Sequence, residues 1–393
     1  MSLSPATSVP SFKEYDEAGI SHEHWKIVLI SGMGFFTDAY DLFIIGVVMT
    51  ILKPLWHVGK LEVSLTESTA LLASAIGAFA FGRVADILGR KRIYGVEVLV
   101  LAAGAIACAC ANSIWWMQAA GLIFGPLLAT ALLATHLSPN IVWRILIGFG
   151  AVPALAVFWQ RRHLKETPRF EAARREAKQQ TFMSGFATLV ASRKLLLYLI
   201  GTSAAWFLMD AAYYGNTVSS PLVLSVLGGN HDLRHKLLSQ LAIFVLFAAP
   251  GYGLAAGLMD RLGRKTIQCI GFLMMAATFS LLAFVPDLTH RAGAFLAVFG
   301  ISFFFTEFGP NATTFVYPSE IFPVKVRTTS HGVAAAVGKL GGFVGTFLFP
   351  YLMHWKGLLG AESAAAAACV TGLAVTWFLL PEPKGRTLEE LSD

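Results

Sequence analysis

One predicted helical face of this chain carries an acid between two aromatic residues. Trp206, Asp210 and Tyr214 are spaced by four, so in a helix they form a continuous stripe. The indole N–H and the phenol O–H can donate hydrogen bonds to an anion, and Asp210 must be protonated or hydrogen-bonded for that anion to lie beside it. An aromatic stripe alone is typical of packing, but the acid within it favours an anion-binding site coupled to protonation.

A second group of polar residues interrupts the apolar stretch around residue 310. Asn311 offers two donors and one acceptor to an anion, and Pro310 frees backbone groups nearby. Glu307 lies one turn before Asn311, and two interpretations stay open: an additional proton-binding site, or an ion-pair partner of Lys339. Lys339 is a cation in a glycine-rich stretch, where it either attracts the anion or releases an aspartate from pairing when the anion binds.

Two further acids lie in the first apolar stretch. Asp38 and Asp41 are three residues apart, hence nearly on one helical face, and phenylalanine and tyrosine residues surround them. Carboxylates in a low dielectric favour the neutral form unless they are paired, so these acids can load and release a proton. The alternative is a structural ion pair or helix cap.

The elements that must position these residues are helices in a bilayer. The chain is 55% hydrophobic and 14% charged, which is typical of an integral membrane protein and fits a soluble enzyme poorly. A span needs about 20 apolar residues, and by that criterion the chain holds about eleven. The expected spans are 27–52, 65–88, 94–116, 117–137, 142–158, 195–227, 237–259, 267–285, 292–317, 332–352 and 358–380.

Several function classes lack the residues that they require. The four cysteines lie in apolar spans without metal-ligand spacing, so we expect packing roles, no metal and no cofactor. The sequence shows no serine elbow and no phosphate-cradling loop, so we expect no enzyme. The net charge of +6 resides in separate loops rather than on one surface, which argues against nucleic acid.

The basic loops predict both topology and domain organisation. By the positive-inside rule they are cytoplasmic, and the longest of them, 159–194, divides the spans into two groups. We therefore expect a cytoplasmic tail at 1–24, an N-terminal transmembrane half at 25–158, a cytoplasmic linker at 159–194, a C-terminal six-helix half at 195–380 and a cytoplasmic tail at 381–393. The polar N-terminus does not resemble a cleaved signal peptide, so the first span is expected to stay.

An internal repeat supports two related halves. GRVADILGRKR at 82–92 recurs as GLMDRLGRK at 257–265. The repeat predicts a tight turn between two helices, in which glycine permits close approach or positive φ and the aspartate meets the arginine cluster. A basic loop that only sets topology is the alternative. The residues concerned are Gly82, Asp86, Gly89 and Arg90 in the first copy and Asp260, Gly263 and Arg264 in the second.

These motifs resemble a known family. GRVADILGRKR is similar to the loop signature of the major facilitator superfamily, whose two six-helix halves rock around a site at the bilayer midplane. Within it, the chain resembles the proton-coupled inorganic phosphate transporters of fungi, plants and bacteria. The matching segments are GMGFFTDAYDLF (32–43), WFLMDAAYYGN (206–216), FGPNATTFVYPSEIFP (308–323) and Lys339 in VGKLGG.

The resemblance implies roles for individual residues. It implies phosphate and proton binding at Trp206, Asp210 and Tyr214, all of which match the family. A short match at 117–121 implies a phosphate contact for Gln118, and the lysine that corresponds to Lys339 is linked in the family to an aspartate of the first span. At the position of Glu307 the relatives usually carry an uncharged residue.

The chain departs from this family in its N-terminal half. The family's fourth span carries a glycine-rich run with an adjacent Asp and Tyr, and this run has no counterpart here. Residues 111–116 resemble the end of the family's third span, and the next residues, Met117-Gln118, already resemble the middle of its fifth span. About forty residues, or one span and a loop, are missing. Three spans then separate two basic loops that should lie on the same side of the membrane. Either 94–137 does not cross the membrane twice, or the sequence is incomplete, or it carries a deletion. We favour an incomplete sequence or a deletion.

The leading interpretation is a monomeric secondary transporter that takes up inorganic phosphate with protons by alternating access. Its location would be the plasma membrane, or the inner membrane in a bacterium, and its partners would be phosphate, protons and lipid. Two alternatives stay open: a sugar or organic-anion porter of the same superfamily, and a non-transporting remnant or sensor, which the missing span favours.

Overall fold

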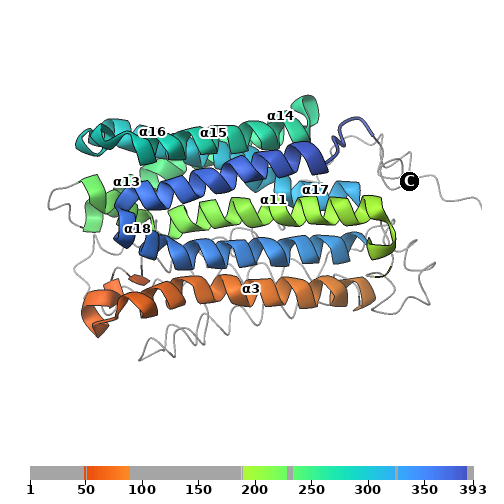
Figure 1. The fold of residues 1–393 in the computed structure, drawn as a ribbon, viewed down its shortest axis with the longest axis horizontal. Coiled ribbons are helices and arrows are strands. Elements are labelled where there is room, and N and C mark those ends of the chain that lie inside the picture. The colour runs from red at the N-terminus through yellow and green to blue at the C-terminus, as the bar shows by residue number, and fades with distance from the viewer. Residues whose placement is uncertain are drawn as a thin grey trace, which may run out of the picture.

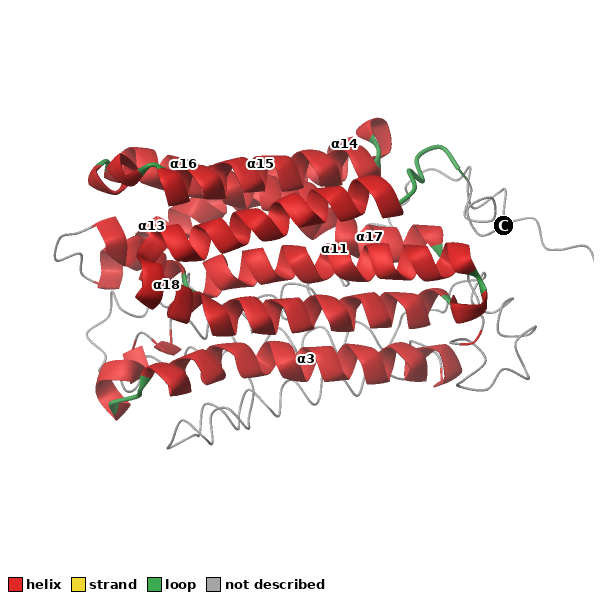
Figure 2. Cartoon of the chain, viewed as in Figure 1, coloured by secondary structure: helices red, strands yellow, loops and turns green. Residues whose placement is uncertain are grey.

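The computed structural model describes residues 48–49, 51–88, 187, 189–227, 233–323 and 326–386. Asp38, Asp41, Gln118 and the missing-span junction at 116–117 lie outside these residues, as do Gly89 and Arg90. Within the described part, every regular element is a helix, as the predicted all-α membrane fold requires (Figure 2).

The helices follow one another with short connections. Two of the elements, η2 and η4, are π-helical segments inside longer helical rods. The elements are α3 (Lys60–Leu88), α11 (Arg193–Val218), α12 (Ser220–Leu224), η1 (Ser225–Leu227), α13 (Leu233–Ile243), η2 (Phe244–Ala248), α14 (Ala249–Leu262), α15 (Arg264–Phe284), η3 (Pro286–His290), α16 (Ala292–Thr306), η4 (Glu307–Asn311), α17 (Ala312–Ile321) and α18 (Arg327–Leu379).

Five helical rods of the described residues are long and apolar enough to cross a bilayer. They are Arg193–Val218, Leu238–Leu262, Arg264–Phe284, Ala292–Ile321 and Arg327–Leu379. The expected span at 195–227 is too long, because α11 ends at Val218 and a new short helix with Pro221 near its start follows. The bounds of the other described helices agree with the expected spans to within a few residues. The chain is a multi-pass membrane protein.

The last rod is two spans joined by a sharp bend. α18 has 53 residues, or about 80 Å at 1.5 Å per residue, which is far more than about 30 Å of hydrocarbon. Gly357 adopts φ 62° and ψ −151°, which is not helical, and the chain reverses there. We call 327–356 the first arm and 358–379 the second arm. α11 lies between the two arms, and α3 lies beside the first (Figure 1).

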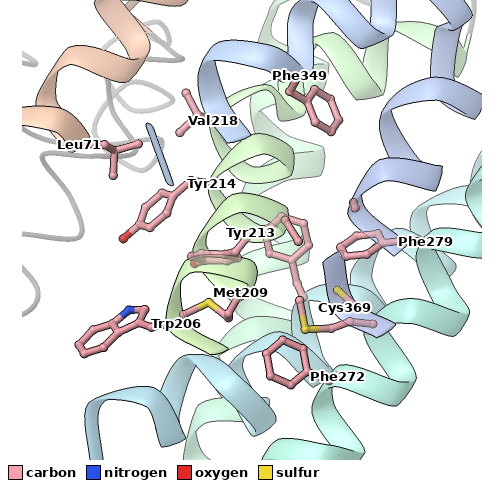
Figure 3. Packing of buried hydrophobic residues seen from close by; sticks show 14 of the residues in the cluster. Leu71, Trp206, Met209, Tyr213, Tyr214, Val218, Phe272, Phe279, Phe349 and Cys369 are labelled. Carbon is pink, nitrogen blue, oxygen red and sulfur yellow. The ribbon is translucent and has the colours of Figure 1, made fainter. Parts of the chain in front are cut away.

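Glycines permit the close contact between α11 and the first arm. A Cβ at Gly341 would collide with the carbonyl of Phe207, and one at Gly345 with the carbonyl of Ala211. Aromatic side chains fill the remaining space, and Trp206 and Tyr214 project from one side of α11 while Tyr213 faces the core (Figure 3). The close contact fixes the distance between polar groups on these two helices.

Candidate functional site

The acid of the predicted stripe forms an ion pair across this close contact. Asp210 of α11 is 1% exposed, and Lys339 Nζ of the first arm lies 3.1 Å from its Oδ2. The same ammonium donates to Tyr214 Oη at 2.9 Å and lies 4.5 Å from the centre of the Tyr214 ring. The structure thus gives Lys339 an aspartate partner in the C-terminal half, whereas the first-span aspartates lie outside the described residues.

Trp206 completes the stripe one turn before Asp210. Its side chain is fully buried, with Phe315 at 4.6 Å and His331 at 5.6 Å between ring centres. Its Nε1 meets no described acceptor at full hydrogen-bond geometry, but it lies near enough to Asp210 to stabilise that carboxylate. A Cβ at Gly338 would collide with the indole, so the glycine provides the space that the ring occupies. The buried N–H is a donor available to an anion.

Glu307 belongs to a neighbouring network rather than to the ion pair. Its Oε1 accepts a hydrogen bond from Tyr213 Oη at 2.8 Å, and its Oε2 accepts one from Asn311 Nδ2 at 2.5 Å. Of the two interpretations of Glu307, pairing with Lys339 is therefore wrong for this conformation, because Lys339 contacts Asp210 and Tyr214 instead. Tyr213 was missed in the sequence, since nothing marks a tyrosine of α11 as the partner of an acid 94 residues away.

The two networks lie side by side. The rings of Tyr213 and Tyr214 are 5.2 Å apart, and these adjacent residues contact Glu307 and Lys339 respectively. Between α11, η4 and the first arm, the structure therefore brings together, alongside Tyr213, six side chains that the sequence predicted. They are Trp206, Asp210, Tyr214 and Lys339 in one network and Glu307 and Asn311 in the other.

A break in the helix positions Asn311. Gly309 has φ −102° and ψ −114°, and Pro310 follows it inside the π-helical segment η4. A Cβ at Gly271 of α15 would collide with Pro310, so the broken segment packs directly on that helix. Below it, the fully buried Gln268 donates to Thr376 Oγ1 at 2.8 Å and accepts from Thr313 Oγ1 at 2.6 Å. Gln268, which the sequence did not single out, therefore ties α17 to α15 and the second arm.

The second copy of the repeated loop forms a tight turn at one end of the helices. Gly263 has φ 95°, and Arg264 Nη2 lies 2.8 Å from Asp260 Oδ1 and 2.7 Å from Glu320 Oε1. Glu382, just after the second arm, accepts from the backbone N–H groups of Arg264 and Lys265, each at 3.0 Å. In the first copy, Gly82 and Asp86 lie in the last turns of α3.

Comparisons with known families match both halves of the chain. The model described as Sugar (and other) transporter matches residues 210–393. The model described as Major Facilitator Superfamily matches residues 32–123. Among solved structures, the proton:xylose symporter XylE bound to 6-bromo-6-deoxy-D-glucose has a TM-score of 0.77 at 18% identity and covers 93% of this chain and 98% of its own. This likeness confirms the major facilitator fold.

Relatives in plants extend over nearly the whole chain. Inorganic phosphate transporter 1-6 of Oryza sativa subsp. japonica is 30% identical over an alignment of 503 positions, gaps included, that covers 96% of this chain and 94% of the relative. Inorganic phosphate transporter 1-1 of Arabidopsis thaliana is 28% identical over an alignment of 509 positions, gaps included, that covers 97% of this chain and 96% of the relative. The chain therefore belongs to the inorganic phosphate transporter family of the major facilitator superfamily, whose members are transporters and not enzymes.

Proposed function

We propose that the protein is a proton-coupled transporter that takes up inorganic phosphate by alternating access. The observation that carries this proposal is the buried Asp210–Lys339 pair, in which a cation able to attract an anion lies beside an acid able to bind a proton. The names of the plant relatives support phosphate as the cargo, and the xylose symporter supports proton coupling. We further propose a monomer in the plasma membrane, or in the inner membrane of a bacterium.

The ion pair suggests how the two substrates are coupled. Phosphate that reaches Lys339 competes with Asp210 for the ammonium, and Trp206 and Tyr214 contribute N–H and O–H donors around it. A carboxylate that loses its cation in a low dielectric favours protonation. Binding of the anion therefore promotes uptake of a proton by Asp210, and the two travel together.

Glu307 gives a second group that responds to protons in the same site. As an anion it holds Asn311 Nδ2 by hydrogen bonding, and as a neutral acid it holds that amide less strongly. Asn311 is then free to turn its donors toward phosphate. Asp38, Asp41 and Gln118 stay predicted contributors from the N-terminal half, and the repeated loops stay the predicted conformational motifs.

Uptake into proteoliposomes tests this function. The full chain should accumulate labelled phosphate when the outside is acidified, and Asp210→Asn should weaken the dependence on acidity, because the amide cannot bind a proton whereas Glu307 still can. Asp287→Asn is a matched control, since it makes the same change at an exposed aspartate of η3. An unchanged rate and pH dependence in Asp210→Asn contradicts the proton role.

Two other functions are separated by the same assay. A sugar porter, which the Sugar (and other) transporter match favours, would show competition by hexoses and none by arsenate. A remnant or sensor, which the predicted missing span favours, would bind phosphate without accumulating it. Competition by arsenate together with accumulation supports the proposal over both.

A further inference from the structure

A buried acid outside the proposed phosphate site lies in the second arm of α18. Glu362 is 0% exposed, and Asn216 in the last turn of α11 is 1% exposed. Asn216 Nδ2 donates to Glu362 Oε2 at 3.3 Å and to the carbonyl of Ala212 at 3.3 Å. This contact joins α11 to the second arm, whereas the Asp210–Lys339 pair joins α11 to the first arm.

The two groups in contact have one unsatisfied oxygen each. Glu362 Oε1 and Asn216 Oδ1 are both buried and make no hydrogen bond to a described residue. Both are acceptors, so neither satisfies the other while Glu362 is ionised. One proton on the carboxyl removes both deficits, because the resulting O–H donates to the amide oxygen while the amide N–H donates to the other carboxyl oxygen.

No cation in the described part of the chain compensates a negative charge on Glu362. The titratable groups of α11 on this side are Asp210, Tyr213 and Tyr214, none of which is positive, and Lys339 is held by Asp210 and Tyr214. On α18 itself, Lys356 is exposed beyond the bend and Cys369 is buried two turns further on. α15 carries its basic residues, Arg264 and Lys265, at its opposite end and packs phenylalanines against this arm (Figure 3). An ionised Glu362 would therefore be unpaired in an apolar surrounding, which is costly.

The pair lies toward the non-cytoplasmic ends of the helices. α11 begins at Arg193 and Lys194, the basic end, and Asn216 is six residues beyond Asp210, or about 9 Å along the helix. Glu362 follows the bend at Gly357 by little more than one turn. The carboxyl thus lies between the phosphate site and the outer surface.

We propose that Glu362 is a second proton-binding site, which holds its proton while packed against Asn216. When the halves rock and water reaches the outer end of α11, the neutral acid exchanges its hydrogen bond with Asn216 for one with water and releases its proton as a carboxylate. Return of the contact requires a proton from water. The inference that Glu362 is protonated rests on its contact with Asn216, and only the coupling of this proton to transport rests on the proposed function.

Infrared spectroscopy of the full chain in detergent tests the protonation. At neutral pH the difference between wild type and Glu362→Gln should contain the C=O stretching band of a hydrogen-bonded neutral carboxylic acid, and this band should disappear reversibly as the pH is raised. Glutamine reproduces the donor and acceptor of the neutral acid, so the variant keeps the contact. Asn216→Leu leaves the carboxyl in place and should shift the band, which assigns it even where Glu362→Gln does not accumulate. Carboxylate bands in place of the acid band at neutral pH overturn the proposal.

Uptake measurements separate this site from the proposed function. In proteoliposomes, Glu362→Gln should keep phosphate uptake but show a smaller ratio between acidic and neutral outside pH, because a fixed neutral group no longer responds to protons. An unchanged ratio overturns the coupling of Glu362 to transport. A wild type that takes up no phosphate contradicts the proposed function alone, since the infrared band reports on Glu362 without transport.

Discussion

Lys339 and Asp210 bridge α11 and the first arm of α18, with Nζ 3.1 Å from Oδ2 and with 15% and 1% of the two side chains exposed. Removing one partner from such a buried pair leaves an uncompensated charge, which costs more than the pair contributes. The stability of the bundle therefore depends on both residues together, and a double-mutant cycle tests this dependence.

Lys339→Met should destabilise the protein by about 3–5 kcal/mol at alkaline pH, where the Asp210 carboxylate stays buried without its cation, and by less at acidic pH, where the acid takes up a proton. The combination of Asp210→Asn and Lys339→Met should recover most of this loss, since no charge then remains unpaired. The free energy of unfolding in detergent measures both. Lys356→Met, at an exposed position of the same helix, should change it by less than about 0.5 kcal/mol. A stable Lys339→Met variant contradicts the pairing.

Gly341→Ala should push α11 away from the first arm, because its Cβ collides with the Phe207 carbonyl. A backbone carbonyl cannot move aside as a side chain does, so the loss should be about 1–3 kcal/mol, together with weaker phosphate uptake as Lys339 is displaced from Asp210. Gly257→Ala is the matched control, since nothing lies within 4 Å of its added Cβ and it is also helical. Its stability should equal or exceed that of the wild type because alanine favours the helix. Equal effects of the two substitutions would show that close packing is not the cause.

The helices and the polar stripe could be predicted from the sequence because both follow from local periodicity. Bilayer thickness sets the length of each span, and the spacing of four places Trp206, Asp210 and Tyr214 on one face of any helix. Pro310 likewise marks the break in its own rod. The position of the bend at Gly357 could also be predicted approximately, because the apolar stretches at 332–352 and 358–380 are together too long for one crossing of the membrane.

The partners of the buried acids could not be predicted, because they depend on how distant helices are rotated against one another. Glu307 contacts a tyrosine 94 residues away, and Glu362 contacts an asparagine 146 residues away. No spacing along the chain encodes such a rotation. Small residues such as Gly341 indicate that two helices approach closely, but they do not say which helix is the partner.

Glu382→Gln should destabilise the end of α15 by about 1 kcal/mol, because the carboxylate caps that helix by accepting from the N–H groups of Arg264 and Lys265. An anion at a helix N-terminus also interacts favourably with the helix dipole, so the loss should shrink as salt is raised. Unfolding at low and high salt measures this difference. Asp287→Asn, in η3 after the other end of α15, should show neither effect. A salt-independent loss contradicts the electrostatic part of the cap.

Tyr213→Phe should cost about 1–3 kcal/mol, because Glu307 Oε1 then lies buried without the donor that Tyr213 Oη supplies at 2.8 Å. Tyr351→Phe is the control, since Tyr351 is 41% exposed and packs on Phe347 rather than on Glu307. The loss should be smaller when Tyr213→Phe is made together with Glu307→Leu, because an aliphatic side chain does not need the donor. Residues in direct contact usually show coupling of about 0.5–3 kcal/mol in such a cycle. If the effects of the two substitutions on the free energy of unfolding are strictly additive, Tyr213 stabilises the bundle by ring packing alone. The role of Glu307 in holding Asn311 then rests only on its contact with the Asn311 amide.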